Sequence, residues 1–163
     1  MKRETVLKVL YITLILSVMA VWGQSCLNKE DSTENSDMVL NMVTSVDDIK
    51  NGPAEEAWKY DYYNAIVRKI AHVVEYSALG FQMICILYLL KKRKIKHYIG
   101  CLYGGLTIAF IDESIQILSS RGPLISDMWI DLGGITVGMI LGTAFSLLVI
   151  KIYKKKQMKQ IEE

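Results

Sequence analysis

The sequence lacks the short motifs that mark most well-known catalytic and structural sites. It contains no P-loop, no nucleophilic serine elbow and no zinc-binding spacing of cysteine and histidine. Its three cysteines, Cys26, Cys85 and Cys101, are odd in number and widely spaced, and two of them fall within long apolar runs. No disulfide framework follows from such a pattern. No single motif therefore identifies a reaction, and the information lies in how apolar and charged residues are distributed.

The apolar residues are clustered rather than spread. They make up 52% of the 163 residues, a length that suits one domain. Four runs are long enough to cross a bilayer as helices, which needs about 20 mostly apolar residues. We therefore expect an all-α integral membrane protein, a single membrane domain over residues 1–163, with four transmembrane helices at 6–23, 72–90, 99–118 and 129–150.

The charges predict how these helices are oriented. The net charge is only +2, but Lys and Arg precede the first run, fill the loop 91–98 and follow the fourth run in the tail 151–163. The loop 24–71 has nine acids and five bases, and the loop 119–128 has Arg121 as its only base. By the positive-inside rule, both termini and loop 91–98 are cytoplasmic and the other two loops lie outside. Orientation alone explains the Lys clusters, so we expect the lipid bilayer and no nucleic acid as a partner.

The first outer loop contains two different stretches. Residues 1–23 are interpreted as an uncleaved signal anchor, because no clear cleavage site follows the apolar core. Residues 24–37 are polar and acidic and are predicted to be loop. From Val39 to Ile49, apolar residues recur at helical spacing before Asn51, Gly52 and Pro53. This segment is too short to span and predicts an amphipathic helix on the outer membrane face or against the bundle.

Ionisable residues inside the apolar runs are the main functional signal. Asp112, Glu113 and Gln116 lie within the third run, and each ionised carboxylate near a helix centre costs about 2.5–3.5 kcal/mol on insertion scales. His72 and Glu75 open the second run, just after Arg68 and Lys69, while Asp127 and Asp131 begin the fourth. Intramembrane groups of this kind must face partners, protons or water, which makes them candidate site residues.

Small residues share helix faces with these acids. Cys101, Gly105 and Ala109 lie on the face of Asp112, and Gly134, Gly138 and Gly142 lie on that of Asp131. Small residues allow membrane helices to approach closely, so we expect the two stripes to meet inside the bundle and hold the acids together. The competing interpretation is homodimerisation through the glycines. The oligomeric state stays open.

Several segments together resemble the VanZ-like family of small bacterial membrane proteins. They are residues 68–76 (Arg-Lys-Ile-Ala-His-Val-Val-Glu-Tyr) with Leu79-Gly80, residues 112–116 (Asp-Glu-Ser-Ile-Gln) with Arg121, and Asp127 and Asp131 leading into Gly133-Gly134. Gln24-Ser25 after the first run also fits the family pattern. The resemblance runs from about residue 1 to residue 150. It implies a multi-pass protein of the bacterial plasma membrane with a role in the cell envelope, and the family's namesake is associated with low-level resistance to the antibiotic teicoplanin.

The first functional hypothesis is a non-enzymatic envelope protein that binds or shields an outer-leaflet lipid or a glycopeptide. Arg68, Lys69 and Arg121 would meet phosphate or carboxylate groups, with Gln116, Asp127 and Asp131 beside them. The structural alternative is that the acids, His72 and Arg121 only satisfy one another, as a buried network that fixes helix register.

A second hypothesis is a membrane-embedded enzyme acting on a lipid-linked phosphate. His72, Glu75, Asp112 or Glu113 would be the catalytic candidates, and Glu75, Asp112, Glu113 or Asp131 would hold a divalent cation. Such oxygen-rich ligand sets suit Mg²⁺, Ca²⁺ or Mn²⁺ better than structural zinc. A third hypothesis, a proton-coupled carrier, is less favoured because four helices without an internal repeat would have to oligomerise.

Overall fold

The computed structural model describes residues 3–27, 29–42, 49, 58–118 and 125–162. Over these residues the chain forms five helices and no strand: α1 (Arg3–Ser25), α2 (Lys29–Leu40), α4 (Trp58–Leu89), α5 (Ile95–Leu118) and α6 (Ile125–Glu162). Four of them, α1, α4, α5 and α6, are long and apolar enough to span a membrane. The predicted all-α class with four transmembrane helices is confirmed.

The packing of the four long helices suits lipid as the surrounding solvent. Large apolar side chains point outward along their length, such as Ile15 of α1, Phe110 of α5 and Ile140 of α6, all more than half exposed. The fully buried core is small and includes Tyr76, Leu79, Ile84, Ala109 and Ile135. Contiguous outward-facing apolar surface of this extent indicates a membrane environment.

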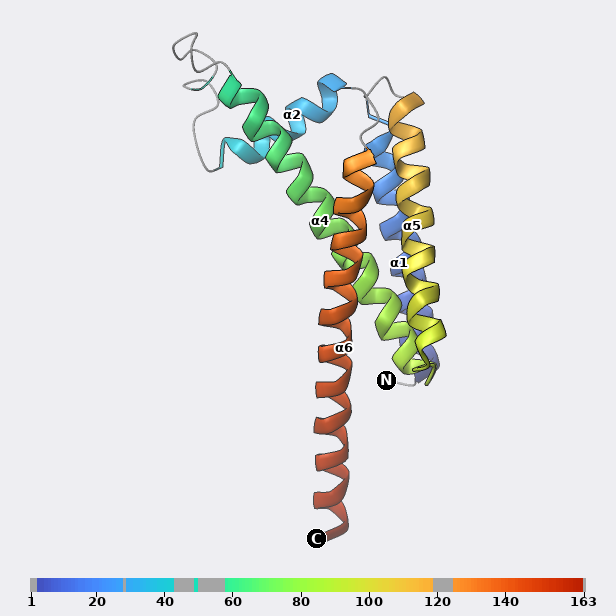
Figure 1. Cartoon of the computed structure of the whole chain (residues 1–163). Helices are drawn as coiled ribbons and strands as arrows, with labels where there is room; N and C mark the ends of the chain where they lie inside the picture. Colours follow the sequence, from blue (N-terminus) through green and yellow to red (C-terminus); the bar gives the residue numbers. More distant parts are fainter. Residues whose placement is uncertain (1–2, 28, 43–48, 50–57, 119–124, 163) are drawn as a thin grey trace.

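The helices are arranged so that α2 lies across one end of the bundle (Figure 1). The end of α1, the end of α5 and the start of α6 lie at this end, which we call the α2 end, while the chain's N-terminus and the turn between α4 and α5 lie at the opposite end. The 32 residues of α4 extend for about 48 Å, more than the roughly 30 Å of a hydrocarbon core. Correspondingly, α4 begins at Trp58 instead of His72, and α6 continues past the bundle.

The closest helix pair is α4 with α6, and glycine makes it possible. Gly134, Gly138 and Gly142 are buried against the backbone of α4, where a Cβ would meet the carbonyl oxygens of Val73, Ser77 and Phe81. Ser77 Oγ also donates a hydrogen bond of 3.0 Å to the Gly134 carbonyl oxygen. The expectation that the small residues of the third and fourth helices would meet each other is therefore wrong: the α6 glycines face α4. Gly105 of α5 instead receives the side chain of Ile135 of α6.

The predicted loop 24–37 is also wrong, because α2 covers most of it. Its composition is polar, but Asp37 of α2 accepts hydrogen bonds of 2.9 Å from the Tyr60 hydroxyl and 3.3 Å from the Asn64 side chain on α4. These part-buried contacts hold the helix against α4, an outcome that local composition does not reveal. The predicted amphipathic segment at 39–49 lies mostly outside the described residues.

The turn from α4 to α5 is tight and basic. Lys92 N–H donates to the Leu87 carbonyl and Lys91 N–H to the Tyr88 carbonyl, which is the hydrogen-bond pattern of a Schellman motif. Lys91 occupies the left-handed position with φ of 59°, a position that usually favours glycine. The short turn places α5 antiparallel to α4, and this returns the acidic end of α5 to the α2 end.

Candidate functional site

Three side chains from three helices meet inside the α2 end of the bundle. Nδ1 of His72 on α4 lies 3.1 Å from Oδ1 of Asp131 on α6, a distance at which the Nδ1–H tautomer donates a hydrogen bond to the carboxylate. The same nitrogen lies 4.0 Å from Oδ2 of Asp112 on α5. Both Asp side chains are fully buried, whereas that of His72 is 23% exposed. We call these three residues the His–Asp cluster.

The carboxylate of Asp112 has partners on two sides. Ser25, the last residue of α1, donates a buried hydrogen bond of 2.5 Å to Oδ1 of Asp112. Gln116, one turn along α5, donates bonds of 3.2 Å to Oδ2 of Asp112 and 3.4 Å to Glu113. The cluster and its hydrogen-bond partners thus join all four long helices, since Ser25 adds α1 to α4, α5 and α6, which carry the three cluster residues.

The cluster also contains a polar atom without a partner. Among the described residues, Oδ2 of Asp131 is buried and makes no hydrogen bond, and the buried hydroxyl of Tyr76 faces Asp112 without a hydrogen bond shorter than 3.5 Å. Tyr76 lies one turn after His72 on α4, with the two rings nearly parallel at 6.2 Å between centroids. Its nearest charged neighbours include Asp112 and Asp131. Buried polar groups are rarely left unpaired in native structures, so Oδ2 of Asp131 is available to bind a further group.

A cavity of about 420 Å³ lies beside the cluster, between the end of α1, α2 and α4. His72 lines it and so connects the cavity to the buried acids. The other polar residues on its walls are Arg68 and Glu75 of α4, Gln24 and Ser25 of α1, and Ser32, Asn35 and Ser36 of α2. The remaining walls are apolar, formed by residues such as Val21, Val39 and Val67.

The comparison with known families gives a match over most of the chain. The model of the family described as VanZ/LLP1 matches residues 6–148, most of the chain. The chain belongs to the VanZ/LLP1 family. No curated protein and no solved structure matches this chain.

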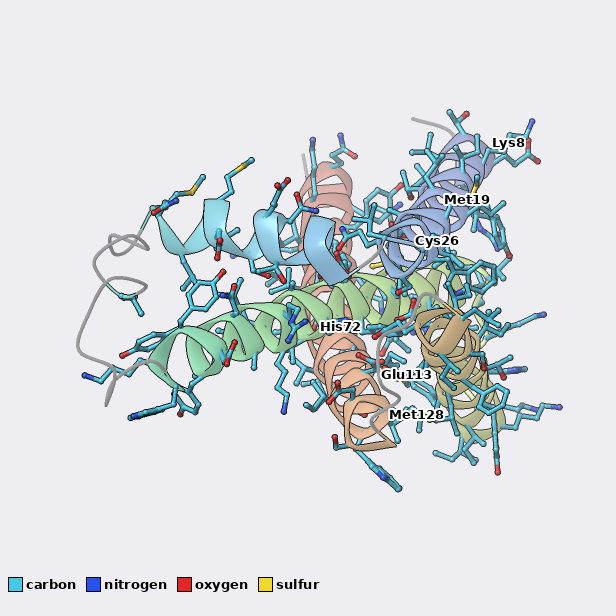
Figure 2. All side chains as sticks on the ribbon, turned by 90° about the horizontal axis from the view of Figure 1, so that it is seen from above. Lys8, Met19, Cys26, His72, Glu113 and Met128 are labelled. Carbon is cyan, nitrogen blue, oxygen red and sulfur yellow. The ribbon has the colours of Figure 1, made fainter. Side chains whose placement is uncertain are left out.

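In this VanZ/LLP1 protein, the structure divides the predicted site residues into three groups. His72, Asp112 and Asp131 meet in the cluster, with Gln116 and Glu113 buried beside them, as Figure 2 shows for His72 and Glu113 on the inner sides of α4 and α5. Arg68 and Glu75 line the cavity. Lys69 is exposed, and Asp127 is half-buried, accepts a bond from Ser126 and is close enough to Glu113 and Asp131 to interact with them electrostatically. Arg121 lies outside the described residues.

The sequence prediction missed the parts of the site that come from α1 and α2. The resemblance included Gln24-Ser25, but nothing in the residues themselves paired Ser25 with Asp112, 87 positions away. The wall supplied by α2 was missed because its stretch was predicted as loop. His72 was predicted as a general base and not as a metal ligand. Its spacing from the acids in the sequence does not distinguish these two roles.

The VanZ/LLP1 site can perform two kinds of chemistry. The cavity combines a guanidinium with several neutral hydrogen-bond donors, which is a set that binds anionic oxygen atoms. The cluster holds an imidazole oriented by a carboxylate, which is the arrangement of a general base. Within the described residues, His72 is the only basic side chain within 4 Å of either buried Asp.

Proposed function

We propose that this VanZ/LLP1 protein binds the phosphate-bearing headgroup of an envelope lipid in the cavity at the α2 end. The observation that carries the proposal is that Arg68 and His72 share a cavity of about 420 Å³ at the end of the bundle. The protein is then a multi-pass protein of the bacterial plasma membrane with both termini inside. In that orientation the α2 end faces the outer leaflet and the cell envelope.

The size and lining of the cavity support a headgroup as the ligand. Small-molecule sites usually enclose about 300–1,000 Å³ and combine apolar walls with a few polar groups. Arg68 offers a planar fork of donors that fits phosphate oxygens. The side chains of Gln24, Asn35 and Ser36 add neutral donors and acceptors for hydroxyl or amide groups on the same ligand. Glu75 disfavours a second phosphate close to its own carboxylate.

Sequestration of such a lipid would give this protein a role in glycopeptide susceptibility. A headgroup held under α2 would be shielded from a large drug that approaches from outside, and this would lower susceptibility to teicoplanin. Direct binding of the glycopeptide itself is less favoured, because a drug of that size exceeds the cavity.

A second candidate function is a membrane-embedded enzyme that acts on a lipid-linked phosphate. The hydrogen bond between His72 and Asp131 favours it, because a carboxylate fixes the ring and increases its basicity. Since His72 also lines the cavity, it would reach a water molecule beside the bound phosphate. Turnover of a lipid-linked phosphate by the purified protein distinguishes the enzyme from a binding protein.

The test uses the full-length protein in nanodiscs, with native mass spectrometry of bound lipid. We expect retention of a lipid-linked pyrophosphate, and Arg68→Gln should weaken it by about 10-fold or more, the loss of one charge-assisted contact of about 1.5–3 kcal/mol. Lys154→Gln, which removes an exposed charge in the C-terminal part of α6, is the control for loss of charge. Lys69→Gln removes the neighbouring, exposed charge. Equal losses in Arg68→Gln and Lys69→Gln, or no selective retention at all, would contradict the cavity as the site.

A further inference from the structure

The His–Asp cluster has the geometry of a metal site. One ligand atom from each of His72, Asp112 and Asp131 can be chosen so that all three lie within 4.8 Å of one another. Two ligands held about 2.1 Å from one ion are separated by roughly 3–4 Å, depending on the angle between them. The observed separations of 3.1 Å and 4.0 Å from Nδ1 of His72 to the two carboxylates fall in this range.

The charges of the cluster also call for a cation. With both carboxylates ionised, even a protonated His72 leaves a net charge of −1 in a bundle interior where Asp112 and Asp131 are fully buried. Uncompensated charge in such a place is strongly unfavourable. A divalent cation with a neutral His72 brings the sum for the ion and the three side chains to zero. In the described part of the chain, no Lys or Arg lies within salt-bridge distance of either Asp.

The unpaired Asp131 oxygen is an independent observation that indicates a ligand. Oδ2 of Asp131 is buried without a partner in a residue with 0% exposure, and the Tyr76 hydroxyl, which faces Asp112, has no hydrogen bond shorter than 3.5 Å. A hydrogen-bonded His–Asp pair alone would leave this Asp131 oxygen unpaired. A bound ion gives the carboxylate oxygen a partner, and water on the ion donates a hydrogen bond to the Tyr76 hydroxyl. We propose that His72, Asp112 and Asp131 bind one divalent first-row transition cation, with Mn²⁺ and Zn²⁺ as the ions that suit one imidazole and two carboxylates.

The surroundings of the cluster fit this assignment. Ser25 and Gln116 donate to Asp112 and so fix the orientation of a ligand carboxylate, as outer-shell hydrogen bonds commonly do in metal sites. His72 is part-exposed and lines the cavity, which gives an ion a path from the α2 end. The set differs from the oxygen-only set expected from sequence: Glu75 and Glu113 lie outside the close group and His72 takes their place. The metal site itself does not depend on the proposed function. Only the identity of a group beside the ion rests on it, since a phosphate held by Arg68 would lie next to the ion.

The test measures metal binding directly and without lipid. Full-length protein in detergent is treated with a chelator and titrated with Mn²⁺, followed by the electron paramagnetic resonance signal of free Mn²⁺, with Zn²⁺ as competitor. We expect one site per chain. Asp131→Asn removes a ligand and should weaken binding by about 100-fold or more, and Tyr76→Phe should weaken it by about 10-fold, the lower end of the range for outer-shell groups. Asp61→Asn, an exposed carboxylate on α4, should leave binding unchanged.

Two further features keep the test decisive. Tyr76→Phe removes one hydroxyl and keeps the aromatic ring in the core, so it should fold even where Asp131→Asn does not, and its weaker binding would then support the site alone. Absence of Mn²⁺ and Zn²⁺ binding by the folded protein, or equal binding by wild type, Tyr76→Phe and Asp131→Asn, would overturn the proposal. Because no lipid is present, a negative result leaves headgroup binding standing, and loss of lipid in Arg68→Gln says nothing about the ion.

Discussion

The Ser25 hydroxyl joins α1 to the buried Asp112 of α5. Ser25 is 3% exposed, and its bond to Asp112 is the contact that brings the end of α1 to the cluster. A charged acceptor in a low-dielectric interior makes such a bond stronger than one at a surface. The energetic weight of Ser25 therefore comes from its partner rather than from its own burial.

Ser25→Ala should reduce stability by about 1–3 kcal/mol, because it leaves one oxygen of a buried carboxylate without a donor. The matched control is Ser114→Ala on α5, whose hydroxyl only donates to the Phe110 carbonyl of its own helix. Denaturant unfolding of the purified protein, followed by tryptophan fluorescence, compares the two. Equal stability of both variants would show that the Ser25 bond contributes nothing.

The sequence could identify Asp112 and Asp131 as site residues but not their partners. Their position within apolar runs is a local property, and the cost of burying a carboxylate applies wherever the helix packs. Which groups meet them depends on how four helices rotate about their axes, and this is set by contacts far apart in the chain. Ser25, Tyr76 and the wall formed by α2 are partners of this kind, which only the packing of the helices reveals.

At the scale of helices, the α4–α6 pair is the frame on which the cluster is built. The glycines of α6 let its backbone approach that of α4. Because Asp131 lies one turn before Gly134, this contact brings Asp131 next to His72. The spacing of the glycines was visible in the sequence. Their partner was not, because small residues fit closely against any helix that presents its backbone.

Gly138→Ala should disrupt this pair, because the added Cβ would collide with the Ser77 carbonyl oxygen, which belongs to a helix backbone and cannot rotate away. Overpacking of this kind costs about 1–3 kcal/mol. Gly133→Ala on the same helix is the control: nothing lies within 4 Å of its Cβ, so it should be neutral or stabilising by up to about 1 kcal/mol. Thermal unfolding in detergent tests both, and a Gly138→Ala protein as stable as Gly133→Ala would contradict the packing.

At the scale of the whole molecule, the structure places the basic segments at one end and the site at the other. The N-terminus and the turn at residues 90–94 lie opposite the α2 end, and α6 continues on their side (Figure 1). The four spans were predictable because composition alone decides whether a helix can lie in lipid. The orientation of the bundle in the membrane stays a prediction, since it depends on charge relative to a bilayer.

We expect both termini in the cytoplasm, because Lys and Arg next to a span remain on that side during insertion. Cys26 is exposed at the α2 end and is a native probe, while Cys85 and Cys101 can be replaced by alanine. In intact cells, a membrane-impermeant maleimide should label Cys26. Lys94→Cys, in a protein that also carries Cys26→Ser, should react only after permeabilisation. Labelling at position 94 from outside would show that the bundle has the opposite orientation. The cavity and its cluster would then face the cytoplasmic leaflet, where they could not shield an outer-leaflet lipid.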